Sequence, residues 1–275
     1  MTHPLIWIGQ RYRVSYVGRL MELGLQASWC AFQNKDGNRK QSLDQLIGQI
    51  YFTGVEAIPL VAFLALVIGS ATILQAATVM PKIGAGDYFG NVMVLVVVRE
   101  VGPLFTAFLV AGRTGSALST YLGNMKVQQE IDALRTMGVD PIRYLVFPSF
   151  AALVVSMFCL TVVFNVVAIF GGYLVVKLLS VSLADFSEVQ LSMSLFLERI
   201  FASMGVMDGV LGVIKPIFFG ILVAVIACYH GINVSNDIRE VPKATTKGVV
   251  NSFVCITLFD TIFALPFLIN LGNLI

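Results

Sequence analysis

Two adjacent ionisable residues, Arg99 and Glu100, lie near the middle of an apolar run over residues 88–112. An ionised side chain costs roughly 3 kcal/mol at the centre of a bilayer, so neither residue is expected to face lipid tails. Neighbouring helical residues point about 100° apart, and the two therefore need a further partner. Asp260 and Glu56, which lie in other apolar runs, are the candidates. The pair predicts either a polar patch that contacts a substrate in passage or a buried ion pair that fixes helix packing.

The residues after this pair predict changes in helix geometry. Gly102 and Pro103 follow directly, and a proline inside a helix removes one hydrogen bond of its ladder. The stretch from Ala111 to Thr120 is dense in small residues, which let helices approach closely. We therefore expect a break near Pro103 and a tight helix contact beyond it.

Other kinds of chemistry have little support in the sequence. The four cysteines show no C-x-x-C spacing, and His3 and His230 have no partner at ligand spacing, so a metal site or a Cys/His nucleophile is not expected. The chain also lacks a Gly-x-x-x-x-Gly-Lys-Ser/Thr loop, and the dipeptide Gly-Lys is absent. If ATP drives this protein, another chain must bind the nucleotide, and no cofactor is expected in this one.

Composition identifies the class of protein that holds these residues. The 275 residues are 57% hydrophobic and 12% charged, against about 25% charged in an average soluble domain, and the mean hydropathy is +0.85. The net charge of +2 offers no basic field for nucleic acid. The sequence therefore predicts an all-α polytopic membrane protein.

Five apolar runs are long enough to cross a hydrocarbon core about 30 Å thick. Thirteen of the 18 lysines and arginines lie in residues 1–48, 113–143 and 230–247, and these cations mark the cytoplasmic side. The N-terminus is thus expected in the cytoplasm and the C-terminus in the periplasm, with Lys215 snorkelling at the outer end of the fourth run. The predicted spans are residues 57–79, 88–112, 145–176, 213–229 and 249–271.

The N-terminal region, residues 1–44, is predicted to be separate from the permease domain over residues 45–275. Its apolar positions recur every three or four residues with arginines between them, a pattern typical of a helix lying in the membrane interface. A helix packed on the protein's own spans is the alternative. No internal repeat is evident in the chain.

A short helix is predicted at about residues 124–138, between the second and third spans. Asn124 is placed to cap its start, and Gly138 suits the left-handed position after its end. Ile131 and Leu134 belong to an apolar stripe along it. Such a helix could insert into a groove on a cytoplasmic partner or lie flat on the lipid interface.

Several motifs together resemble the MlaE (YrbE) family, the permease subunits of ABC transporters that work with MCE-domain proteins. The resemblance covers about residues 45–271, whereas residues 1–44 share only an amphipathic character. The motifs are Arg99-Glu100-x-Gly102-Pro103, Ala111-Gly-Arg-x-Gly-Ser-Ala-Leu118, Met137-x-Val139-Asp140-Pro141 and Ala244-Thr-Thr-x-x-Val249-Val250-x-Ser252.

The resemblance implies a homodimer of five-span subunits with an interfacial N-terminal helix, in the inner membrane of a Gram-negative bacterium. Two cytoplasmic ATPases, which hold ATP and Mg²⁺, would dock on the loop helix. An outward-facing cavity between the subunits would hold phospholipid and open toward a hexameric MCE protein, in a system that maintains outer-membrane lipid asymmetry. The docking residues would be Glu130, Ile131, Asp132, Leu134, Arg135, Met137 and Gly138; Arg99 and Glu100 would lie in the cavity, with Val79, Met80 and Ile83 at its mouth. Asp260, the candidate partner of the pair, is assigned to the same cavity on its own position in the fifth span.

Two other functions remain open at this point. One is a secondary transporter in which Arg99, Glu100 and Asp260 relay protons, although the missing internal repeat disfavours it. The other is a membrane scaffold that anchors an MCE protein without transporting lipid. The intramembrane charges would then have no role in passage.

Overall fold

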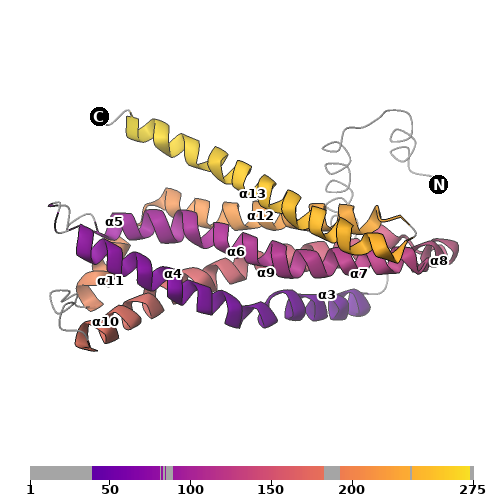
Figure 1. Ribbon diagram of the computed structural model, residues 1–275, viewed down its shortest axis with the longest axis horizontal. Coiled ribbons are helices and arrows are strands. Elements are labelled where there is room, and N and C mark those ends of the chain that lie inside the picture. Colours follow the sequence, from indigo (N-terminus) through magenta and orange to yellow (C-terminus); the bar gives the residue numbers. More distant parts are fainter. Residues whose placement is uncertain are drawn as a thin grey trace.

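The computed structural model describes residues 39–80, 82, 84, 89–182, 193–235 and 237–272. Every regular element within these ranges is helical, and five helical segments are long and apolar enough to cross a membrane. The prediction of an all-α protein with five spans is confirmed. The helices run along the long axis of the molecule, with α8 at one end and α10 and α11 at the other (Figure 1). The spans are Leu46–Val79, Gly90–Val127, Tyr144–Leu178, Met207–Ile232 and Ile238–Ala264.

The first span is a helix interrupted by one short turn. The interruption falls at Gly54, and Pro59 stands in the first turn of the next helix, where its missing N–H costs nothing. The first described helix begins at Arg39, inside the region assigned to the N-terminal segment; residues 1–38, where the interfacial helix is predicted, lie outside the described part. The elements are α3 (Arg39–Thr53), η1 (Val55–Ala57) and α4 (Ile58–Val79).

The second span is longer than the sequence predicts. The prediction of an end at residue 112 is wrong, because the helix continues to Val127 through the stretch of small residues. These residues do make a close contact, as expected: a Cβ at Gly115 would lie 3.2 Å from Cγ1 of Val223. The elements are α5 (Phe89–Met93), η4 (Val94–Val101), α6 (Gly102–Val110), η5 (Ala111–Gly115) and α7 (Ser116–Val127), of which η4 and η5 are π-helical.

The loop helix is shorter than predicted and begins later. Gln129 adopts the left-handed conformation (φ +60°) and separates α7 from α8 (Glu130–Thr136), so Asn124 lies inside α7 and caps nothing. The prediction for Gly138 is confirmed, since its φ is +78° and its N–H bonds back to the Arg135 carbonyl at 3.0 Å.

The remaining spans pack around α12. This helix begins at Val206, seven residues before the predicted start of the fourth span, and contacts α9, α13 and α7. The fifth span, α13, runs beside α12 and then diverges from the bundle toward the C-terminus (Figure 1). The elements are η6 (Ile142–Val146), α9 (Phe147–Val166), η7 (Val167–Gly171), α10 (Gly172–Ser182), α11 (Met193–Ser203), α12 (Val206–Ile232), η9 (Ile238–Glu240) and α13 (Val241–Gly272).

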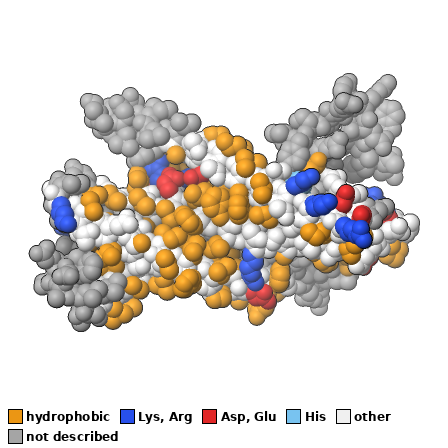
Figure 2. Space-filling view, in the orientation of Figure 1, with side chains coloured by type: hydrophobic (Ala, Val, Ile, Leu, Met, Phe, Trp, Pro, Cys, Tyr) orange, Lys and Arg blue, Asp and Glu red, His pale blue; other side chains and the backbone are white. Residues whose placement is uncertain are grey.

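The surface is apolar along the middle of the molecule. Phe63 on α4 and Leu258 on α13 are more than half exposed, as expected for side chains that face lipid. Figure 2 shows hydrophobic side chains over most of this face and charged ones gathered near one end. A small mixed group of acidic and basic side chains also lies within the hydrophobic area. The fold therefore has one charged end and an apolar belt that contains a few charges.

Candidate functional site

Five ionisable residues from three spans form one connected group, called here the charged cluster. Arg99 and Glu100 come from η4, Asp208 and Lys215 from α12, and Asp260 from α13. Each ion pair in it joins atoms 3.6 Å apart or closer. The cluster therefore links the second, fourth and fifth spans inside the apolar belt.

Lys215 is the centre of the cluster and is fully buried. Its Nζ donates to Oε2 of Glu100 at 2.6 Å, to Oδ1 of Asp260 at 3.0 Å and to the Arg99 carbonyl oxygen at 3.3 Å. An ammonium has three N–H donors, so these three acceptors satisfy it completely. A buried lysine is tolerated here because its charge is paired and its hydrogen bonds are made.

The Arg99 carbonyl is available to Lys215 because of the local sequence. Pro103 has no N–H, so this carbonyl, four residues earlier, has no α-helical donor. The chain around it is the π-helix η4, and α6 then begins at Gly102. Near Pro103, where the sequence predicts a break, the Arg99 carbonyl thus accepts a hydrogen bond from Lys215 on a neighbouring span.

Gly102 lets α9 approach the same region. A Cβ at this position would collide with Oδ1 of Asn165 on α9, an atom that is buried without a hydrogen-bond partner among the described residues. Glycine at this position therefore leaves room for the Asn165 side chain, one residue before the proline that has no N–H for the Arg99 carbonyl.

Arg99 has two acidic neighbours in the cluster. Its Nε lies 3.5 Å from Oε1 of Glu100, and its Nη1 lies 3.6 Å from Oδ1 of Asp208. Both contacts are longer than a typical charge-assisted hydrogen bond. Asp208 is thus a further acidic partner of Arg99, and Lys215 is a further partner of Glu100, as the sequence predicts for this pair.

The cations of the cluster are more buried than its carboxylates. The side chains of Lys215 and Arg99 are 0% and 7% exposed, whereas those of Glu100, Asp208 and Asp260 are 29%, 19% and 16% exposed. Two cations face three carboxylates, which leaves a formal charge of −1. The accessible edge therefore offers hydrogen-bond acceptors rather than donors.

Of the two partners that the sequence proposes for Arg99 and Glu100, the structure confirms one. Asp260 does join Arg99 and Glu100, through Lys215, as predicted. The proposal of Glu56 is wrong, because Glu56 pairs with Arg113 at 2.9 Å, outside the cluster. The snorkelling role given to Lys215 is also wrong, since the earlier start of α12 places this residue inside the bundle.

The remaining predicted site residues lie at the two ends of the molecule. Val79 is exposed and Met80 half-buried at the end of α4, and Ile83 is outside the described part. On α8, Ile131 is 2% exposed and so packs within this chain, which corrects its assignment to an outward stripe. Asp132 pairs with Lys126 and Arg135. The outward face of α8 and its end is formed by Glu130, Ala133, Arg135, Thr136, Met137 and Gly138.

A sequence model of the family described as Permease MlaE matches residues 46–265, a range that contains the charged cluster and α8. The chain belongs to the MlaE permease family. A probable ABC transporter permease protein of Rickettsia bellii is 34% identical over 211 residues, which is 77% of this chain and 78% of that protein. The MlaE permease protein of the Haemophilus influenzae intermembrane phospholipid transport system is 33% identical over 219 residues, or 79% and 80% of the two chains.

The similarity of this MlaE-family chain extends to a plant protein. TRIGALACTOSYLDIACYLGLYCEROL 1 of Arabidopsis chloroplasts is 29% identical over 225 residues, which is 82% of this chain and 62% of the plant protein. The resemblance to MlaE permeases drawn from the motifs is confirmed. The chain is a multi-pass membrane protein of a family whose named relatives include permeases of ABC transporters and of phospholipid transport systems.

Proposed function

We propose that this chain is the membrane subunit of an ATP-driven phospholipid transporter and that the charged cluster lies on the lipid path. The observation that carries the proposal is the three-way ion network around Lys215, which joins three spans inside an apolar belt of an MlaE-family chain. Burying five ionisable side chains in a membrane is costly, and such residues usually mark a substrate pathway. The name of the Haemophilus relative supports phospholipid as the substrate.

The partially exposed carboxylates give the cluster its role in the proposal. Glu100, Asp208 and Asp260 accept hydrogen bonds, so they suit the hydroxyl or ammonium groups of a lipid head-group better than its phosphate. Apolar neighbours suit the acyl chains, which gain about 0.8 kcal/mol per buried CH₂. The head-group would replace Lys215 as the hydrogen-bond donor to Glu100 and Asp260. The contacts between the three spans would loosen as the lipid passes.

Energy enters from a separate ATPase that docks at the α8 end. The second span carries Arg99 and Glu100 and continues through α6, η5 and α7 to the turn before α8. A displacement of α8 would therefore be transmitted along one helical rod to the cluster. The proposal includes a homodimer in the bacterial inner membrane, with α8 on the cytoplasmic side and a hexameric MCE-domain protein at the opposite end. This chain itself would hold no nucleotide.

The test replaces Glu100 by Gln in the complex purified with the products of neighbouring genes. We expect the ATPase and the MCE-domain protein to remain bound, and ATP-dependent phospholipid transfer to fall roughly tenfold or more, because a neutral amide binds a cationic donor more weakly. Glu56→Gln is the matched control, since Glu56 is also paired with a cation but lies outside the cluster. Transfer at the unmodified rate in Glu100→Gln would contradict the proposal.

A proton-coupled secondary transporter is the second candidate, and the burial of Lys215 between two carboxylates favours it. The same preparation separates the two. Transport that follows a proton gradient and needs no ATPase would replace the first proposal. A complex that binds an MCE-domain protein but moves no lipid would instead identify a scaffold.

A further inference from the structure

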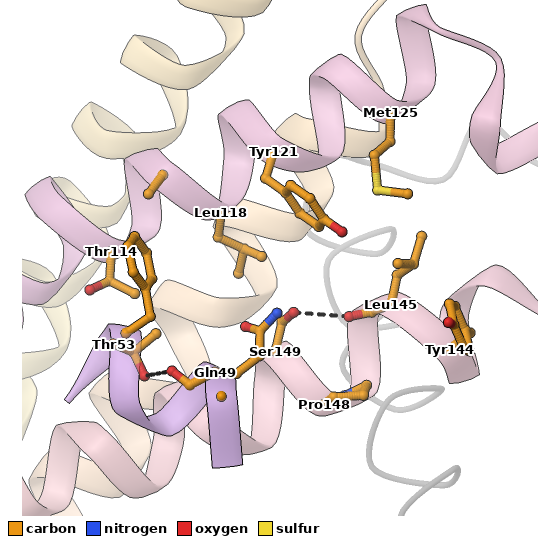
Figure 3. A pocket seen from close by; sticks show the side chains of 13 residues that line it. Gln49, Thr53, Thr114, Leu118, Tyr121, Met125, Tyr144, Leu145, Pro148 and Ser149 are labelled. Carbon is orange, nitrogen blue, oxygen red and sulfur yellow. Dashed lines mark hydrogen bonds between the residues drawn. The ribbon is translucent and has the colours of Figure 1, made fainter. Parts of the chain in front are cut away.

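A pocket of about 580 Å³ lies between α3, α7 and the start of α9 (Figure 3). Its residues come from the beginning of the first span, the end of the second and the beginning of the third. Thr114, on its wall, is 14 residues from Glu100 along one helical span, which corresponds to roughly 20 Å at 1.5 Å per residue. The pocket is therefore separate from the charged cluster. It is lined by Gly48, Gln49, Phe52, Thr53, Thr114, Ala117, Leu118, Tyr121, Met125, Tyr144, Leu145, Pro148 and Ser149.

Among the described residues, the lining combines apolar side chains with neutral polar groups and includes no Lys, Arg, Asp or Glu. Thr53 is satisfied, since its hydroxyl bonds to the Gln49 carbonyl and to Ser156. Thr114 is 2% exposed, and its Oγ1 has no hydrogen-bond partner among the described residues. This oxygen is itself buried, so the accessible hydroxyl of the lining is that of Tyr121, a residue that is 48% exposed. The chemistry of the lining fits a neutral ligand with acceptor groups and apolar parts.

Three aromatic residues of the lining are also exposed, and they indicate the depth of the pocket in the membrane. Phe52, Tyr121 and Tyr144 are 48%, 48% and 40% exposed. Tyr121 points from α7 toward the wall formed by Leu145 and Tyr144 (Figure 3). Tyrosine favours the level of lipid head-groups, where its ring is apolar and its hydroxyl is hydrated. The pocket thus lies where the ester groups of a diacyl lipid would meet it.

We propose that this pocket binds the glycerol and ester end of a membrane diacyl lipid. An ester carbonyl would accept a hydrogen bond from the Tyr121 hydroxyl, and the first acyl carbons would lie against Leu118 and Leu145. A phospholipid and a diacylglycerol share this part of the molecule. The proposal does not depend on the charged cluster binding a transported lipid.

The first experiment places a fluorescent reporter in the pocket of the full chain in detergent micelles. Met125→Trp supplies the reporter and leaves every polar group of the lining in place, and Trp7→Phe with Trp29→Phe removes the other tryptophans. The probes are dibrominated phosphatidylethanolamine and dibrominated diacylglycerol, whose bromines quench nearby tryptophan. We expect saturable quenching, reversed by the unbrominated lipid. Saturation by both probes would identify the glycerol ester as the bound group, and saturation by phosphatidylethanolamine alone would add a contribution from the phosphate.

A filling variant then tests whether the quenching comes from the pocket. A Cβ at Gly48 would meet no atom within 4 Å, so Gly48→Phe places a ring in open space without a backbone clash. We expect it to weaken binding of either probe roughly tenfold or more. Ile47→Phe is the control, because Ile47 lies on the same helix, is 61% exposed and is outside the lining. Tyr121→Phe, which removes only the hydroxyl, should weaken binding about fivefold.

The result that would overturn the proposal is quenching that never saturates with either probe, or saturable quenching that Gly48→Phe leaves unchanged. Native mass spectrometry of lipid bound to the chain without the reporter gives a second measurement. Equal lipid occupancy in Gly48→Phe and Ile47→Phe would overturn the proposal in the same way.

Discussion

Replacing Lys215 by Met removes the ammonium on which Glu100 and Asp260 converge. The methionine keeps most of the apolar stem, so the change is chiefly the loss of charge. Two charge-assisted hydrogen bonds, at 2.6 and 3.0 Å, disappear together with the bond to the Arg99 carbonyl. Each charge-assisted bond contributes roughly 1.5–3 kcal/mol, and their sum is roughly 3–6 kcal/mol.

Part of this loss is recovered by hydration of the carboxylates. The side chain of Glu100 is 29% exposed and that of Asp260 is 16% exposed, so neither becomes a fully buried unpaired charge. We therefore expect the free energy of unfolding to fall by about 3–5 kcal/mol, the range found when one partner of a buried ion pair is removed. Lys126→Met is the matched control. Lys126 pairs with Asp132 at 3.1 Å in a more exposed setting, so its loss should cost about 1 kcal/mol or less.

The assay is equilibrium unfolding of the two variants in mixed micelles, followed by circular dichroism. The decisive quantity is the difference between the two losses of unfolding free energy, which should be roughly 2–5 kcal/mol. Equal losses in Lys215→Met and Lys126→Met would refute the reasoning, because the burial of Lys215 and its three acceptors would then contribute nothing to the free energy of unfolding.

Further predictions concern the packing of α4 and the two faces of α8. Gly69→Ala should lower the free energy of unfolding by roughly 1–3 kcal/mol, because the new Cβ would collide with the Ala168 backbone. Gly48→Ala, on α3, should raise the free energy of unfolding by up to about 1 kcal/mol, because its Cβ would lie in open space. Thermal unfolding of the two variants measures both changes. Met137→Asp, at a residue 69% exposed, should leave the fold unchanged and abolish copurification of an ATPase, and retained copurification would exclude Met137 from the docking face. Ile131→Asp buries a charge and should cost about 3 kcal/mol or more in the same unfolding assay, and a smaller loss would contradict its burial.

The parts of the fold that follow from local sequence could be predicted. Hydropathy is sufficient to find the five spans, because a bilayer requires long apolar helices whatever they contact. The left-handed Gly138 could be predicted because glycine adopts positive φ without a Cβ penalty. An intramembrane position for Arg99 and Glu100, with Asp260 as a partner, followed from the cost of burying charge.

The parts that depend on packing between distant segments could not be predicted. The apolar run of the fourth span begins at residue 213 in the sequence, which places Lys215 near the end of that span. The helix α12 instead begins at Val206, so Lys215 lies inside the bundle and Asp208 joins the cluster as well. Charge balance is an available signal, since the two carboxylates inside the predicted spans, Glu100 and Asp260, need more than Arg99. Ile131 was misplaced because an apolar position on a short helix can face either its own chain or a partner, and only the tertiary contact decides.

The most direct test of the central claim removes the charges of the network while keeping its shape. In the triple variant Glu100→Gln, Lys215→Met, Asp260→Asn, no unpaired charge remains from these residues, so the free energy of unfolding should stay within about 2 kcal/mol of the original. The measurement is ATP-dependent phospholipid transfer by the complex assembled with this variant. We predict intact assembly with transfer reduced roughly tenfold or more. Transfer at the original rate would contradict the claim and would leave the charged cluster as a packing element.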